Sequence, residues 1–231
     1  MERKWWTLLA VCLATFMLLV DVTIVNVALP SIQSDLDASL TSLQWVVDAY
    51  ALTLAALLLT AGTLADRFGR RRIFLIGVTI FTAASFACGI ASSATFLNLA
   101  RAVQGIGGAA MFATSLALIA QEFTGRERGT AIAAWGSTVG LAVAIGPLVG
   151  GALTEALSWP WIFYVNLPIG IFTVVLGRAR MAEYANPEAG RIDIPGPAHS
   201  AATHFGILPA FRFTRDSCRP QFTADADTAI Q

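Results

Sequence analysis

Two charged side chains, Asp21 and Arg101, lie within long apolar runs of this sequence. A charge inside a bilayer is costly, so such a residue usually faces the interior of a helix bundle and serves a function. Asp21 follows Trp5 by sixteen residues, or ~24 Å along a helix, and Arg101 follows Leu97 by four residues, or ~6 Å. If the two helices cross a ~30 Å hydrocarbon core in opposite directions, both charges lie at the same level. An ion pair between them is therefore geometrically possible.

Three more polar side chains in the apolar runs are candidates for a transport site. Asp48 falls at about the same level as the pair, four residues into the second run. It could bind a proton or a cation, but a place at the membrane interface explains it equally well. Asn26 and Gln104 could line a cavity or hydrogen-bond between helices.

The sequence carries no pattern typical of an enzyme or a metalloprotein. His199 and His204 are the only histidines, and both lie in the polar C-terminal part of the chain. The three cysteines are too scattered for a metal site or a disulfide framework. We find no nucleophile beside a base and no phosphate-binding loop. We therefore expect no catalytic residue, no metal, no cofactor and no nucleic-acid partner.

Six apolar segments can carry the charged pair across a bilayer. The chain is 56% hydrophobic and only 13% charged, which is typical of a polytopic membrane protein. Each segment can cross the hydrocarbon core as a helix, the form that pairs every backbone group within one segment. The segments are Trp5–Leu29, Gln44–Ala65, Ile73–Ala91, Leu97–Ala120, Gly129–Thr154 and Trp161–Gly177. We expect residues 1–180 to form an all-α transmembrane bundle of six helices.

Basic residues gather in alternate connections, which predicts the orientation of the bundle. The connections at 30–43, 92–96 and 155–160 contain no lysine or arginine. By the positive-inside rule, the N-terminus and the C-terminus of a multi-pass protein of the plasma membrane would face the cytoplasm. The basic positions are Arg3, Lys4, Arg67, Arg70, Arg71, Arg72, Arg126, Arg128, Arg178 and Arg180.

Four motifs appear in order along the segments, and together they resemble the major facilitator superfamily. They are Leu19–Pro30 (LVDVTIVNVALP), Gly62–Arg72 (GTLADRFGRRR), Leu99–Gly108 (LARAVQGIGG) and Gly136–Gly151, which contains GPLVGG. The chain looks closest to the proton-coupled multidrug exporters with fourteen spans, over about residues 5–195. The resemblance implies two repeats of three helices and proton-coupled efflux of drugs or other small amphipathic molecules by alternating access, as in antibiotic resistance.

The same resemblance implies roles for the motif residues. Asp21 would be the carboxylate that gains and loses a proton, and Arg101 would tune its proton affinity; a fixed structural ion pair is the alternative. The basic turn would latch the two halves of a transporter through Gly62, Asp66, Arg67, Gly69, Arg70 and Arg71, or it would only set the topology. The fifth span would limit proton leak through Gly136, Gly140, Gly146, Pro147, Gly150 and Gly151, or its small residues would only pack against other helices.

The chain departs from the family after residue 196, where further apolar spans are expected and a polar segment follows instead. We expect residues 181–231 to form a poorly ordered cytoplasmic tail, produced by a truncation or a frameshift. The partners would then be protons, a small-molecule substrate and the lipid bilayer. A missing C-terminal bundle or a second copy of the chain would complete the cavity. The alternative is a non-transporting membrane fragment or a partner subunit.

Overall fold

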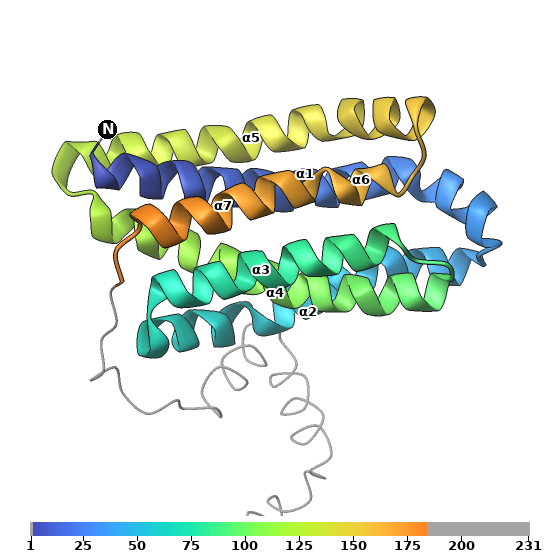
Figure 1. Cartoon of the computed structure of the whole chain (residues 1–231), viewed down its shortest axis with the longest axis horizontal. Helices are drawn as coiled ribbons and strands as arrows, with labels where there is room; N and C mark the ends of the chain where they lie inside the picture. The colour runs from blue at the N-terminus through green and yellow to red at the C-terminus, as the bar shows by residue number, and fades with distance from the viewer. Residues whose placement is uncertain (1, 184–231) are drawn as a thin grey trace, which may run out of the picture. The chain divides into compact units, whose positions relative to one another are not determined.

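The computed structural model describes residues 2–183, and this part of the chain consists of seven α-helices with short connections (Figure 1). All of these residues belong to the first of two units, Met1–Ala189. The predicted tail from residue 184 onward lies outside the described residues. The helices are α1 (Arg3–Leu36), α2 (Leu40–Phe68), α3 (Arg70–Gly89), α4 (Ala94–Glu122), α5 (Gly125–Ala156), α6 (Trp161–Tyr164) and α7 (Asn166–Arg180).

The six predicted spans correspond to six helical segments that are long and apolar enough to cross a membrane within residues 2–183. The sixth segment is Trp161–Arg180, in which α6 and α7 follow one another. Helices α1 and α5 continue through Pro30 and Pro147. Serine caps begin two helices: Ser39 accepts from the backbone N–H of Ser42, and Ser93 does the same for Phe96.

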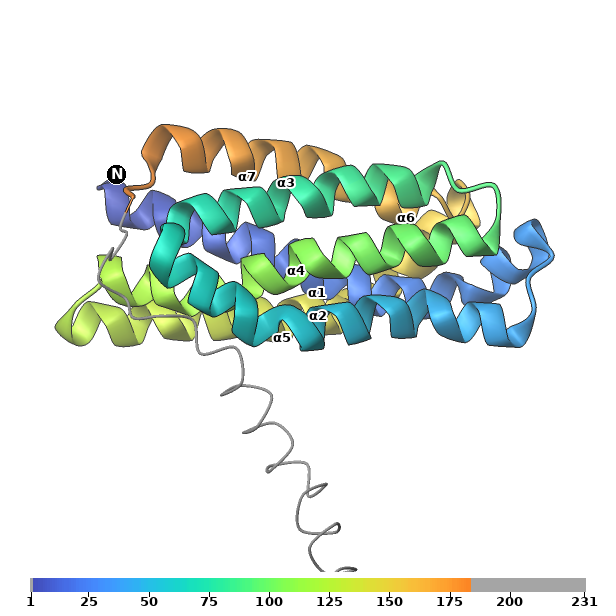
Figure 2. The ribbon, with the colours of Figure 1, turned by 90° about the horizontal axis from the view of Figure 1, so that it is seen from below.

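The helices pair in a pattern expected of two three-helix repeats. Helix α2 packs along α4, and α5 packs along α1, so the second helix of each repeat lies on the first helix of the other. Helix α3 also packs on α4, and α7 packs on α1 and α3. Figures 1 and 2 show the helices running side by side along the long axis of the bundle. This arrangement places α1 and α4, which carry Asp21 and Arg101, in the interior.

Glycines bring α3 and α4 into close contact. A Cβ added at Gly107 would lie 2.6 Å from the backbone nitrogen of Phe81, and one added at Gly77 would lie 2.8 Å from the carbonyl oxygen of Gly107. Small residues at such a crossing let two backbones approach, which is a main source of helix association in lipid. The close contact holds α3 against α4, the helix that carries Arg101.

The predicted basic connections all meet at one end of the bundle, which we call the basic end. Lys4 pairs with Glu127 at the start of α5 (2.8 Å), and Arg180 at the end of α7 lies over the ring of Trp6. Arg71 in the first turn of α3 donates to the last carbonyls of α7. These contacts join the ends of helices α1, α3, α5 and α7. At the opposite end, the indole of Trp159 donates to Asp35.

Helices α2 and α5 are the least covered of the six spans. In the most apolar 18-residue stretch of each, only 11% is buried inside the bundle, against 61% in α1. On α2 the open side shows apolar residues such as Leu52 and Leu59, and on α5 it shows Leu141 and Leu148. Such sides can face lipid or another helix bundle. The fold therefore has a covered core formed by α1 and α4 and two open flanking helices.

Candidate functional site

The site is built on the ion pair between Asp21 of α1 and Arg101 of α4. The Arg101 Nη1 donates to the Asp21 Oδ2 at 2.5 Å, and both side chains are at most 1% exposed. Asp21 and Arg101 thus lie at the same depth in the bundle, as the helix rise indicated, and they are in direct contact. Two charges removed from water in this way need good geometry and further hydrogen bonds to offset their desolvation.

Two amide side chains donate these hydrogen bonds to the carboxylate, and a serine hydroxyl accepts from both amides. Gln104 and Asn166 both donate to the Asp21 Oδ1, at 2.9 Å and 3.1 Å. Both amides also lie within hydrogen-bond distance of the Ser85 hydroxyl, at 2.9 Å and 3.3 Å. Asp21, Gln104, Asn166 and Ser85 come from α1, α4, α7 and α3, so four helices meet at one carboxylate. We call these four residues and Arg101 the Asp21 network.

The guanidinium of Arg101 has partners besides Asp21. Its Nε donates to the Val46 carbonyl of α2 at 3.0 Å, and its Nη1 also lies 2.7 Å from the Gln104 Oε1. The Tyr50 ring lies beneath it, with the guanidinium carbon 4.3 Å from the ring centroid, a distance typical of a cation–π contact. Arg101 therefore has a backbone carbonyl, an amide oxygen and an aromatic ring as neutral partners in addition to the Asp21 carboxylate.

Sequence reasoning identified three members of this network and missed the other two. Ser85 and Asn166 are fully buried, but neither carries a charge that would mark it within its apolar segment. The signal that could have found Asn166 is the same one that marked Asp21, a strongly polar side chain in a membrane span. Gln104 was predicted to line a cavity or to bond between helices, and the structure shows the second.

Asp48 and Asn26 do not join the Asp21 network. Both are exposed, and both line an open groove of about 570 Å³ between α1 and α2 toward the opposite end of the bundle. The Asn26 amide donates to the Val22 carbonyl of its own helix. Their places fit a polar wall of an open cavity, and their predicted roles stay predictions.

The basic turn is a tight and internally paired connection. Gly69 has φ +105°, a backbone conformation that favours glycine, and it joins α2 directly to α3. The predicted pairing of Asp66 occurs with Arg70, whose Nε and Nη2 lie 2.8 Å and 2.6 Å from one carboxylate oxygen. Arg67 stays exposed with its guanidinium over the Phe68 ring. A Cβ added at Gly62 would have no atom of a described residue within 4 Å, so close packing within residues 2–183 does not require a glycine at this position.

The glycines of α5 divide between two faces of the helix. Gly146 and Gly150 pack closely on α1, where an added Cβ at Gly150 would lie 3.2 Å from the Cα of Ile24. Gly136, Gly140 and Gly151 meet nothing within 4 Å. Among residues 2–183, only Gly146 and Gly150 of this motif pack closely on another helix, and the predicted role of the motif in limiting proton leak stays a prediction.

Comparison with known proteins agrees with this architecture. The family model described as Major Facilitator Superfamily matches residues 11–217. The chain belongs to the major facilitator superfamily. This is a family of transporters rather than enzymes, and together with the six apolar helices it makes the chain a multi-pass membrane protein.

Curated relatives cover most of this chain, but the chain spans less than half of their length. A puromycin resistance protein of Streptomyces alboniger is 42% identical over 90% of this chain and 42% of its own length. A multidrug resistance protein of Mycobacterium tuberculosis is 44% identical over 82% of this chain and 36% of its own length. A riboflavin transporter of Clostridioides difficile is 36% identical over 85% of this chain and 43% of its own length.

Two solved structures show the same fold at low sequence identity. A peptide transporter superimposes with a TM-score of 0.68 at 14% identity, over 94% of this chain and 47% of the other. A bacterial homologue of the lysosomal transporter Spinster, in an inward-facing conformation, superimposes with a TM-score of 0.66 at 23% identity, over 90% and 50%. The superfamily bundle predicted from the motifs is thus confirmed.

Proposed function

We propose that this chain forms the N-terminal bundle of a proton-coupled exporter of small amphipathic molecules that works by alternating access. The observation that carries the proposal is the Asp21 network, a buried carboxylate held between one cation and two amides from different helices. An intramembrane ionisable residue of this kind is a functional site by default. Drug and antibiotic resistance proteins among the relatives support the direction of transport and the class of substrate.

Asp21 is the proton carrier in this proposal, and Arg101 controls its affinity for the proton. When Asp21 is charged, it bonds to α4 through Arg101 and Gln104 and to α7 through Asn166. Protonation weakens all of these bonds together, because a neutral carboxyl accepts weaker hydrogen bonds than a carboxylate. The packing of α1 against α4 and α7 then changes with the proton load, which couples a proton to a helix movement.

The open sides of α2 and α5 are where a second bundle would pack in this proposal. The rest of a longer chain or a second copy would supply that bundle, and the substrate would bind between the two near the midplane. The open glycines of α5, Gly136, Gly140 and Gly151, would allow the close approach that limits proton leak. The basic turn with Asp66 would latch the two bundles at the cytoplasmic end, and both termini would lie on that side.

Dye efflux in cells that express this chain tests the proposal. The Asp21→Asn variant removes the proton-carrying group with almost no change in shape, and Glu155→Gln, at an exposed carboxylate of α5, is the matched control. We expect efflux that stops when a protonophore collapses the proton gradient, is lost in Asp21→Asn and is kept in Glu155→Gln. Efflux that survives the protonophore or the Asp21→Asn substitution would refute the coupling role. No efflux from a chain confirmed in the membrane would favour a partner-dependent or inactive fragment.

A further inference from the structure

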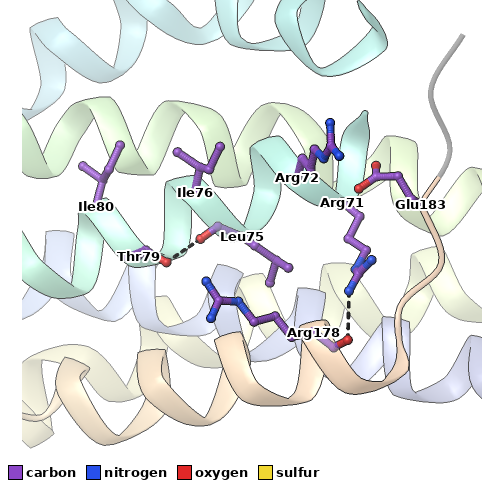
Figure 3. A pocket seen from close by; sticks show the side chains of 8 residues that line it. All are labelled: Arg71, Arg72, Leu75, Ile76, Thr79, Ile80, Arg178 and Glu183. Atoms are coloured by element: carbon purple, nitrogen blue, oxygen red, sulfur yellow. Dashed lines mark hydrogen bonds between the residues drawn. The ribbon is translucent and has the colours of Figure 1, made fainter. Parts of the chain in front are cut away.

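A pocket at the basic end, between α3 and α7, combines positive charge with apolar walls. It has a volume of about 500 Å³ and is lined by Arg71, Arg72, Leu75, Ile76, Thr79, Ile80, Arg178 and Glu183 (Figure 3). Three arginines and one glutamate give it a formal charge of +2. Nothing in the network around Asp21 uses this pocket, because its walls lie on the outer sides of α3 and α7.

The three arginines of the pocket differ in their contacts with the rest of the bundle. Arg71 is already committed to the fold, since its Nη2 donates to the Arg178 carbonyl at 2.8 Å and its Nε donates to the Gly177 carbonyl. The guanidinium groups of Arg72 and Arg178 are exposed and make no hydrogen bond or ion pair with any of residues 2–183. They extend from two different helices, α3 and α7, and Figure 3 shows them pointing in different directions at the rim of the pocket. Two unpaired guanidinium groups on facing helices are suited to an anion with several oxygens.

The apolar part of the pocket continues away from the arginines along the seam between α3 and α7. Thr79 also lines a second groove of about 320 Å³, whose walls are almost entirely apolar and include Phe86, Ile171 and Val175. These three side chains are 50%, 58% and 61% exposed. From Arg72 to Ile80 the helix rises ~12 Å, which is most of one ~15 Å leaflet of a hydrocarbon core. The seam therefore offers an anion site at the membrane surface and a slot for a hydrocarbon chain below it.

We propose that the α3–α7 seam binds an anionic phospholipid, with the phosphate of the headgroup between Arg72 and Arg178 and one acyl chain along Ile171 and Val175. Basic pockets between transmembrane helices are suited to anionic headgroups. A zwitterionic lipid fits less well, because its choline or ethanolamine cation would meet the net positive charge of the pocket. Glu183 at the rim faces the site with the opposite sign, so it lowers the affinity and keeps the lipid exchangeable. The inference does not depend on the proposed transport activity.

Native mass spectrometry of the chain released from mild detergent tests the proposal directly. The probe is an equimolar mixture of phosphatidylglycerol and phosphatidylcholine with identical acyl chains. We expect wild type to retain phosphatidylglycerol preferentially and Arg72→Gln/Arg178→Gln to lower that retention about 25-fold, since one basic residue near an anionic lipid contributes about fivefold. The matched control is Arg126→Gln/Arg128→Gln, which removes two charges from the same end of the bundle but outside the pocket. This control is expected to keep wild-type retention, and an equal loss in both double variants would overturn the proposal.

Two further arms separate a lipid from a free anion and confirm the slot. Val175→Trp fills the apolar groove, so it is expected to lower phosphatidylglycerol retention severalfold, whereas Leu148→Trp on the open side of α5 is expected to leave it unchanged. Equal retention by the two tryptophan variants, or displacement of the lipid by millimolar inorganic phosphate, would point to a soluble anion and overturn the proposal. Thermal unfolding of each variant checks that the fold is kept, and if the double glutamine variant unfolds, Arg72→Gln and Arg178→Gln are each expected to lower retention about fivefold. Arg72→Lys/Arg178→Lys, which keeps both charges, is expected to retain the lipid.

Discussion

Neutralising Asp21 and Arg101 singly and together tests whether the buried pair acts as one unit. Asp21→Asn removes one charge at constant shape, and Arg101→Met replaces the guanidinium with an apolar side chain of similar length. Each single change leaves an unpaired charge in a site that is at most 1% exposed. Breaking a buried pair from one side typically costs about 3–5 kcal/mol, while removal of both partners is often close to neutral.

The remaining partners place each single variant near the lower limit. Without Asp21 as a carboxylate, Arg101 keeps the Val46 carbonyl and the Gln104 Oε1. Without Arg101, Asp21 still accepts from Gln104 and Asn166. We therefore expect each single change to lower the free energy of unfolding by about 3 kcal/mol. The double variant loses hydrogen bonds worth about 0.6 kcal/mol each in a membrane protein, or about 2 kcal/mol in all. The coupling energy is then about 4 kcal/mol.

The assay is reversible unfolding in mixed micelles of dodecyl maltoside and sodium dodecyl sulfate, followed by intrinsic fluorescence. The six tryptophans of the chain provide the signal. The control cycle uses Asp66 and Arg70, the same residue types at spacing i,i+4 on the surface of the basic turn, with side chains 49% and 26% exposed. A surface pair of this kind contributes about 0.3–0.5 kcal/mol.

Additive free energies in the Asp21–Arg101 cycle would refute the reasoning. A coupling energy within ~0.5 kcal/mol of zero is what independent sites show. A value equal to that of the Asp66–Arg70 cycle would mean that water reaches the pair in spite of its burial. In either case the Asp21 network could not transmit a protonation change between helices.

Three further changes follow from single contacts. Gly107→Ala places a Cβ 2.6 Å from a backbone nitrogen of α3 and should cost about 1–3 kcal/mol, whereas Gly136→Ala, which meets open space, should change stability by less than ~1 kcal/mol. Asn166→Leu removes a buried donor to the Asp21 network and should cost about 1 kcal/mol in the same micelle titration, with a lower rate of efflux. Trp159→Phe removes the 2.7 Å bond to Asp35, so amide exchange at 157–162 should accelerate about fivefold, as one lost hydrogen bond of about 1 kcal/mol predicts.

For each of these variants, one outcome would contradict the proposed contact or indicate a general loss of stability. Equal melting temperatures for Gly107→Ala and Gly136→Ala would contradict the close crossing of α3 and α4. Asn166→Leu that behaves like wild type would show that the donated hydrogen bond has no role, since leucine has no donor. Faster amide exchange throughout α1 in Trp159→Phe, rather than at the connection alone, would indicate global loosening.

The number of membrane spans and the depth of their charged residues could be predicted because these are local properties of the chain, whereas helices such as α1 (Arg3–Leu36) extend beyond the predicted apolar segments. A span needs a length of apolar residues set by the bilayer, and the helix rise of ~1.5 Å per residue then sets the depth of Asp21 and Arg101. The alternation of basic connections likewise needs no tertiary information, and the structure gathers Lys4, Arg71 and Arg180 at one end of the bundle as the alternation requires. The motifs carried the family assignment for the same reason.

Which face of each helix meets which neighbour was decided only by the tertiary structure. The α5 motif carries several glycines that the sequence does not distinguish, but packing on α1 uses Gly146 and Gly150 and leaves Gly136 open. Ser85 and Asn166 join the Asp21 network because α3 and α7 turn these side chains inward against α1 and α4. Composition and spacing determine how deep a residue lies in a membrane. The rotation of a helix about its own axis depends on contacts among several helices at once, so it emerges only when the bundle packs.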